Sequence, residues 1–287
     1  MAKKKKDKNL LNWSEMIVWC YLAVMLGIFP LYYQNRYWNI GAAKYRFFRL
    51  MTLIMLIYLA VTQICKCLFD SKKEKFQMKL SRMDRVVLLY MIAAVVSWTL
   101  SPWRTDAWIG SEGWYMGLLS QLMFAGIYFA LSRFGTVSEW LLWVIGVSGA
   151  IVFIFAYIHR FNLDPLGLYE GVAEDEKIGF LGFLGNATWY SSYLCVILPV
   201  MAGVYIMCDW SKVKNGPLFR GWLSVFLFLG FCGVVTQNSD SVYVGMGLAF
   251  LFLLWFAMED LQCWKKFVET GLIVIAAAKF TGILQIV

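Results

Sequence analysis

Long apolar runs recur along the whole chain and leave only short polar connections between them. A helix needs about 20 apolar residues to cross the hydrocarbon of a bilayer, and most of these runs approach that length. Hydrophobic residues make up 61% of the chain and charged residues 15%, against about 25% charged residues in soluble domains. The sequence therefore predicts an all-α, polytopic membrane protein of about nine transmembrane helices. The expected spans are 16–33, 47–69, 86–101, 114–131, 140–158, 187–208, 221–236, 241–258 and 267–287.

No polar block between these runs is large enough to form a separate domain. We therefore expect residues 1–287 to be a single transmembrane domain that opens with a basic segment, 1–15. The lysines at its start resemble those of a signal peptide, but the first apolar run ends in Phe-Pro-Leu-Tyr-Tyr without a small-residue cleavage site. An uncleaved first helix is the prediction.

The net charge of +8 is concentrated in alternate connections. Lysine and arginine kept in short loops mark the cytoplasmic side of a membrane, so we expect the N-terminus in the cytoplasm. Anionic headgroups on that side attract the excess of positive charge, and no nucleic-acid partner is needed to explain it. The basic set is Lys3 to Lys6, Lys8, Lys66, Lys72, Lys73, Lys75, Lys79, Arg82, Arg85, Arg133, Lys212, Lys214, Arg220, Lys265 and Lys266.

The first outer connection with chemical features runs over 101–117 and is rich in glycine, aromatic residues and charges. Arg104 is a candidate phosphate ligand, because a guanidinium binds phosphate through charge-assisted hydrogen bonds. Glu112 is a candidate base. The alternative is that both are solvated charges at the membrane surface.

The second and longest outer connection runs over 159–186. His159, the only histidine of the chain, is a candidate base, although a His-Arg pair at a helix end is more often an interface anchor. Glycine recurs at every third residue in Gly179, Gly182 and Gly185, which indicates backbone packed closely at the membrane surface.

A wholly polar turn, 236–241, separates the seventh and eighth apolar runs. Its short side chains, including Gln237 and Asp240, are candidates to hydrogen-bond a sugar or phosphate, or they cap two helices. In the last run, Lys279 is an ionisable residue within a predicted span, which either reaches the surface or marks a polar cavity. Cys65 and Cys67 lack partner ligands at zinc spacing, so we expect no metal and no cofactor.

Taken in order, these three connections resemble the O-antigen ligase and polymerase family of bacterial membrane proteins. The resemblance rests on GSEGWYMGLL at 110–119, on LGNATWYSSYL at 184–194, where the family opens a span with Gly-Asn, and on TQNSDS at 236–241. Two features depart from the family. Ser-Arg often follows the threonine at 236, and an arginine often precedes the glycine at 117, where this chain has Trp114 and Tyr115.

Members of the family are longer, and a large outer loop carries their essential histidine and further arginines. The present chain ends inside an apolar run, so we expect it to be the amino-terminal part of a longer protein that supplies the catalytic loop. The resemblance implies a GT-C-like helical bundle in the bacterial cytoplasmic membrane.

The reaction that the resemblance implies is transfer of a glycan from a polyprenyl pyrophosphate carrier to an acceptor at the outer face of that membrane. The partners would be this lipid-linked donor, a glycan or lipid acceptor, and membrane lipids. On this chain Arg104 is the outer arginine best placed for the phosphates, and Arg160 is the second. Asn186, Gln237 and Asp240 complete the expected substrate-binding set.

Three other functions stay open. A polysaccharide polymerase would use the same donor with a lipid-linked acceptor. A transporter or flippase for lipid-linked glycans would share the topology but should line its path with several intramembrane charges, of which only Lys279 is clear. A non-catalytic membrane protein is the third.

Overall fold

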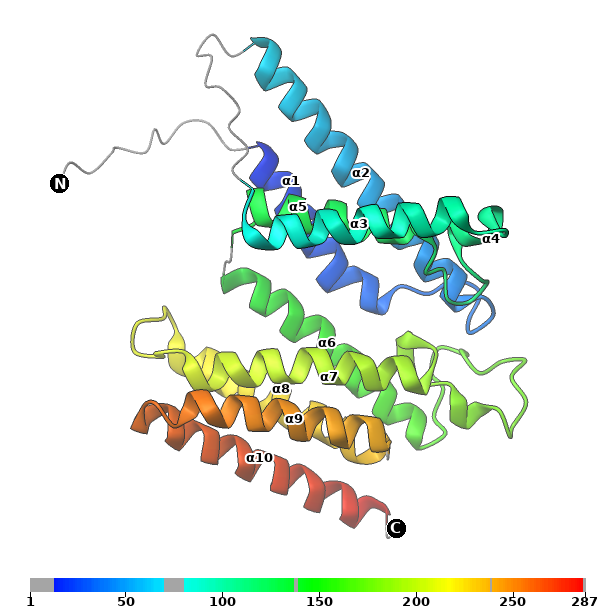
Figure 1. The fold of residues 1–287 in the computed structure, drawn as a ribbon. Helices are drawn as coiled ribbons and strands as arrows, with labels where there is room; N and C mark the ends of the chain where they lie inside the picture. Colours follow the sequence, from blue (N-terminus) through cyan, green and yellow to red (C-terminus); the bar gives the residue numbers. More distant parts are fainter. Residues whose placement is uncertain (1–12, 70–79, 137–138, 238, 286–287) are drawn as a thin grey trace, which may run out of the picture. The chain divides into compact units, whose positions relative to one another are not determined.

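The computed structural model describes residues 13–69, 80–136, 139–237 and 239–285 (Figure 1). Every regular element in these ranges is a helix, and they contain no strand. Seven of the described helices are long and apolar enough to cross a membrane, which makes this an all-helical, multi-pass chain. They are Trp13–Leu31, Ile40–Leu68, Arg82–Leu100, Glu139–Arg160, Ala187–Met207, Gly216–Gln237 and Asp240–Ala257.

The chain forms two compact units, which we describe separately. Unit 1 comprises residues 1–29 and 41–141, and unit 2 comprises residues 30–40 and 142–287. The expectation of one domain, like the count of nine spans, stays a prediction.

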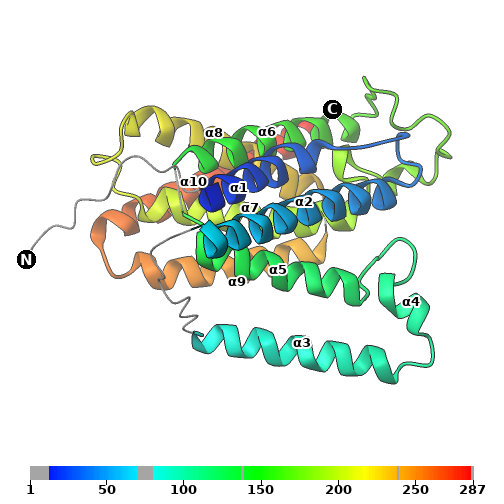
Figure 2. The ribbon, with the colours of Figure 1, turned by 90° about the horizontal axis from the view of Figure 1, so that it is seen from above.

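Unit 1 contains five α-helices. α1 (Trp13–Ala23) continues through a π-helical turn, Val24–Ile28, and is followed by α2 (Ile40–Phe69), α3 (Arg82–Leu100), α4 (Arg104–Ile109) and α5 (Leu118–Phe134). A small core joins α1, α2 and α5 through Val18, Tyr21, Met55, Leu59 and Ala130. α3 lies beside α5, and α4 connects their ends (Figure 2).

The start of α3 is fixed by a capping box. The Ser81 hydroxyl accepts the Asp84 N–H at 3.1 Å, and the Asp84 carboxylate accepts the Ser81 N–H at 2.7 Å. The same carboxylate accepts hydrogen bonds from Arg133 at 2.7 Å and from the Tyr128 hydroxyl at 2.9 Å, both on α5. Because α3 and α5 are antiparallel neighbours, this cluster holds the first turn of one against the last turn of the other.

Unit 2 consists of most of α6 (Glu139–Arg160) together with α7 (Ala187–Met207), α8 (Gly216–Gln237), α9 (Asp240–Ala257) and α10 (Leu261–Gln285), which lie side by side in Figure 1. Its core is larger than that of unit 1, and α7 and α8 approach closely within it. A Cβ added to Gly230 would lie 2.2 Å from Leu198 Cδ2, and one added to Gly233 would lie 2.3 Å from the Tyr190 hydroxyl oxygen. Small residues therefore let these two helices pack at short range.

The observed helix starts differ from the starts of the apolar runs in both directions. α2 begins at Ile40, seven residues before the predicted start at 47. The added turns include Lys44, whose ammonium donates to the Phe29 carbonyl at 3.1 Å. α5 begins at Leu118 instead of 114, and α10 begins at Leu261 instead of 267. α10 is not among the seven spans that meet the length and hydropathy criteria, and its Lys279 is exposed.

Much of the predicted cytoplasmic charge falls outside the described residues. This applies to Lys3 to Lys6, Lys8, Lys72, Lys73, Lys75 and Lys79, and also to Asn238 in the third polar connection.

Candidate functional site

The turn between α3 and α5 forms an open pocket in unit 1 with a volume of ≈ 480 Å³. Its lining includes Tyr90, Ser97 and Trp98 on α3, Ser111 and Trp114 in the turn, and Gln121 on α5. Along α3 the lining extends from Tyr90 to Trp98, which is about 12 Å of helix. The pocket thus extends from the turn along much of the helix.

Two glycines allow the backbone of this turn to cross itself. Gly110 has φ +92°, and a Cβ on Gly117 would lie 2.5 Å from the Gly110 nitrogen. The Gly117 N–H donates to the Ile109 carbonyl at 3.1 Å, and Tyr115 stacks on Tyr45 of α2 at 4.5 Å between ring centroids. Glycine is required at both positions because a side chain on either residue would push the backbone at 110 away from the backbone at 117.

The pocket wall combines aromatic rings with hydrogen-bonding groups. The Tyr90 hydroxyl donates to Gln121 Oε1 at 2.7 Å, and Gln121 Nε2 donates to the Met116 carbonyl at 3.2 Å. The Trp98 indole donates to the Arg104 carbonyl at 2.9 Å. A wall of this kind suits a ligand that has both apolar faces and hydroxyl groups.

Arg104 and Glu112 lie close to this pocket in the sequence but do not line it. Arg104 is the first residue of α4, and Glu112 lies in the turn that follows it. Both side chains are exposed. This exposure is compatible with binding a ligand and with simple solvation, so it does not distinguish the two roles.

His159 lies in unit 2 and is buried, with 3% of its surface exposed. The Gly182 N–H donates to His159 Nδ1 at 3.1 Å, and the Tyr37 hydroxyl oxygen lies 3.0 Å from the same nitrogen. The Tyr37 hydroxyl also donates to the Gly182 carbonyl at 2.9 Å. An N–H group can only donate, so Nδ1 acts as the acceptor and the proton of the neutral ring is assigned to Nε2.

The loop that follows α6 folds over this imidazole. His159 Nε2 lies 3.6 Å from Asp164 Oδ1, and the Asp164 carboxylate also accepts the N–H groups of Leu168 at 2.8 Å and Tyr169 at 2.7 Å. His159 is therefore an interior group under a folded loop and does not have the exposure of an interface anchor.

Two phenols beside His159 stay protonated well into the alkaline range. Burial raises the pKa of Tyr37 far above its usual value, and the nearby Tyr169 and Asp164 raise it further. Burial raises the pKa of Tyr169 to about 12, although the charge of Arg160 opposes the shift. Tyr169 donates to the Phe180 carbonyl at 3.0 Å. Both phenols thus serve as neutral donors that tie the loop together.

Arg160 and Gln237, which are candidates from different connections, are joined directly. Arg160 Nη2 donates to Gln237 Oε1 at 2.8 Å, and Gln237 Nε2 donates to the Ala187 carbonyl at 2.8 Å. Asn186 caps α7, because its Oδ1 accepts the Thr188 N–H at 2.7 Å. The ends of α6, α7 and α8 therefore meet in one polar cluster.

Four buried polar atoms close to this cluster in the sequence have no hydrogen-bond partner among the described residues. They are Arg160 Nε, His159 Nε2, the Tyr190 hydroxyl and the Tyr157 hydroxyl. Buried polar groups are normally satisfied, so these atoms have capacity for water or a ligand. Asp240, the remaining candidate, is exposed in the first turn of α9.

The three regularly spaced glycines of the loop have different surroundings. A Cβ on Gly182 would lie 3.3 Å from Ala156 Cα, and one on Gly185 would lie 2.6 Å from Ile40 Cγ2, and both residues have positive φ. Gly179 has nothing within 4 Å of such a Cβ. Close backbone packing is thus confirmed at Gly182 and Gly185 and is absent at Gly179.

Sequence reasoning did not identify Tyr37, Asp164 or Tyr169 as neighbours of His159. Tyr37 precedes His159 by 122 residues and lies in another connection, so no local pattern links the two. An aspartate five residues beyond a helix-end histidine is the one local signal that could have suggested part of this network.

No known protein family, curated protein or solved structure matches the chain. The resemblance to the O-antigen ligase and polymerase family therefore stays a hypothesis.

Proposed function

We propose that this chain acts on lipid-linked glycans in the bacterial cytoplasmic membrane and belongs to a protein that transfers a glycan from a polyprenyl pyrophosphate to an acceptor hydroxyl. The observation that carries the proposal is the pocket beside the turn 110–117, because the residues that resemble the O-antigen ligase family line part of it.

The chemistry of the pocket is compatible with such a donor. Aromatic rings pack against the apolar faces of sugars, and hydroxyl and amide groups exchange hydrogen bonds with sugar hydroxyls. Trp98 and Trp114 supply the first kind of contact, and Ser97, Ser111 and Gln121 supply the second. The wall that follows α3 toward Tyr90 would leave space for part of an isoprenoid chain.

Transfer requires a cation for the leaving group and a base for the acceptor. The acceptor oxygen bonds to the anomeric carbon, the bond to the carrier pyrophosphate breaks, and the acceptor proton passes to the base. In unit 1 we assign the pyrophosphate to Arg104. Arg160, with Gln237, is the separate candidate phosphate ligand in unit 2. Asn186 and Asp240 are the remaining candidates for contacts with the glycan. Of the two candidate bases we favour Glu112, because His159 Nδ1 already accepts the Gly182 N–H.

The proposed orientation has the N-terminus in the cytoplasm and about nine crossings of a GT-C-like bundle. The distribution of charge within unit 1 supports it. Arg82 and Arg85 lie in the first turn of α3 and Arg133 lies in the last turn of α5, whereas Arg104 and Glu112 lie beyond the opposite ends of those helices.

The test is glycan transfer in cells that express the protein from its own gene. We expect Arg104→Ala to abolish transfer and to leave membrane insertion intact, because the leaving group would lose its cation. Arg85→Ala is the matched control, since Arg85 is also exposed in unit 1 but lies at the other end of α3. Unchanged transfer by Arg104→Ala, or equal loss in the control, contradicts the assignment.

A further inference from the structure

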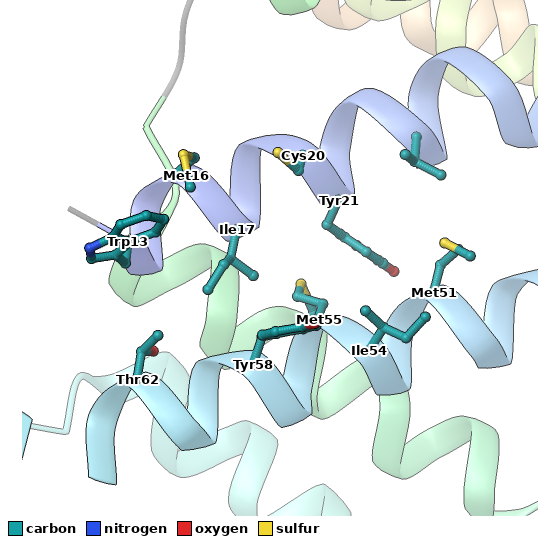
Figure 3. A pocket seen from close by; sticks show the side chains of 11 residues that line it. Trp13, Met16, Ile17, Cys20, Tyr21, Met51, Ile54, Met55, Tyr58 and Thr62 are labelled. Carbon is teal, nitrogen blue, oxygen red and sulfur yellow. The ribbon is translucent and has the colours of Figure 1, made fainter. Parts of the chain in front are cut away.

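A second groove in unit 1 lies between α1 and α2, and it is not part of the proposed glycan site. Its volume is ≈ 380 Å³. Figure 3 shows that the two helices line it with facing side chains, with Trp13 and Thr62 at one end and Met51 toward the other. On α1 the lining extends from Trp13 to Val24, or about 16 Å of helix.

The middle of this groove is apolar. Ile17, Ile54 and Met55 form much of its wall, and unbranched methionine side chains adapt readily to flexible apolar ligands. The Tyr21 hydroxyl does not introduce an unpaired polar group, because it is hydrogen-bonded to Thr52 at 3.0 Å. The groove thus offers a long surface that suits a hydrocarbon chain.

The Trp13 end of the groove is polar and basic. Thr62 lies 3.4 Å from the Ser14 hydroxyl, to which Gln63 Nε2 donates at 2.8 Å and Lys66 Nζ at 3.5 Å. Lys66 lies just beyond the groove lining, one helical turn after Thr62. The nearby acid, Glu15, is also outside the lining, and its carboxylate accepts a hydrogen bond from Thr136 at 2.7 Å.

We propose that this groove binds one acyl chain of an anionic phospholipid, with the phosphate near Lys66. The polarity of the groove supports this occupant: the apolar length would hold the chain, Trp13 suits the headgroup region, and the ammonium complements the phosphate charge. A neutral phospholipid would gain the apolar contacts but less of the electrostatic attraction. A second protein helix would not use the cation.

The test is native mass spectrometry of the full chain released from nanodiscs that contain equal amounts of phosphatidylglycerol and phosphatidylcholine. We expect the wild type to retain phosphatidylglycerol preferentially. Lys66→Gln should lower the ratio of retained phosphatidylglycerol to phosphatidylcholine about fivefold, since one basic residue near the surface contributes about that factor. Lys265→Gln, another exposed lysine but in unit 2, should leave the ratio unchanged.

A second pair of variants tests the position of the acyl chain. Ile54→Trp would fill the groove and should abolish lipid retention, whereas Ile57→Trp, an exposed position on the same helix outside the groove, should not. Thermal unfolding checks that each variant is folded. Equal retention of both lipids by the wild type, equal effects of the two tryptophans, or retention of a second copy of the chain in place of lipid overturns the proposal. None of these results depends on glycan transfer.

Discussion

At the residue scale, the surroundings of His159 assign it a role in holding the loop between α6 and α7. Its Nδ1 accepts the Gly182 N–H while its ring is covered by Tyr37 and Tyr169. A catalytic base must be able to receive a proton from an acceptor, and Nδ1 already faces a donor. The hydrogen bond at Nδ1 therefore favours a structural role for His159 over a role as catalytic base.

This interpretation predicts different effects for two substitutions of His159. His159→Phe leaves the buried Gly182 N–H without an acceptor, and we expect it to lower the free energy of unfolding by about 1–3 kcal/mol. His159→Asn keeps an acceptor near the position of Nδ1 and should be milder. Thermal unfolding in detergent and proteolysis within 170–178 measure the effects. If His159→Asn abolished glycan transfer without loosening the loop, His159 would instead be a base.

Tyr169 predicts a dependence of stability on alkaline pH. Its pKa in the folded protein is about 12, whereas an unfolded tyrosine titrates near pH 10. Between these values the unfolded chain loses a proton that the folded chain keeps, so the free energy of unfolding falls as pH rises. We expect the difference in melting temperature between wild type and Tyr169→Phe to shrink from pH 10 to 12. Parallel curves would contradict this.

At the element scale, the loop 161–186 depends on glycine at some positions and not at others. Gly185→Ala should destabilise the protein by about 1–3 kcal/mol, because its backbone has φ +84° and its Cβ would strike Ile40. Gly179→Ala is the matched control and should be nearly neutral, since its Cβ would meet nothing within 4 Å. Thermal unfolding compares the two, and equal losses would contradict the packing described for the loop.

The long helices were predictable because an apolar run of membrane length has few other ways to satisfy its backbone. Their ends were not, because hydropathy does not register a polar helical turn such as the one around Lys44. α4 was missed altogether, since six residues, Arg104–Ile109, are too few to show a helical period.

The site was predictable in part. Sequence patterns selected Arg160, Asn186 and Gln237 one by one, and the structure brings them together at the ends of α6, α7 and α8. Their contacts depend on which helices are neighbours, and a single sequence does not specify this. The contact between Tyr37 and His159 could not be predicted either, because it also depends on which segments are neighbours in space.

At the scale of the whole molecule, the orientation predicts which introduced thiols are reachable from outside. In a background with serine at Cys20, Cys65 and Cys67, we expect a membrane-impermeant maleimide to label Glu112→Cys in intact cells. It should label Arg85→Cys only after the membrane is permeabilised, because α3 separates the two positions. The opposite pattern would invert the topology, and labelling of both in intact cells would contradict a membrane-spanning α3.

The uneven anchoring of α3 has a mechanical consequence. The buried residues of this helix are Asp84, in its first turn, and Met91, at its middle, and the cluster around Asp84 fixes the first turn to α5. The second half is joined to the turn through α4, where the Trp98 indole donates to the Arg104 carbonyl at 2.9 Å. Because the pocket lies along this part of α3, a bend of the helix about its anchored end would change the width of the pocket.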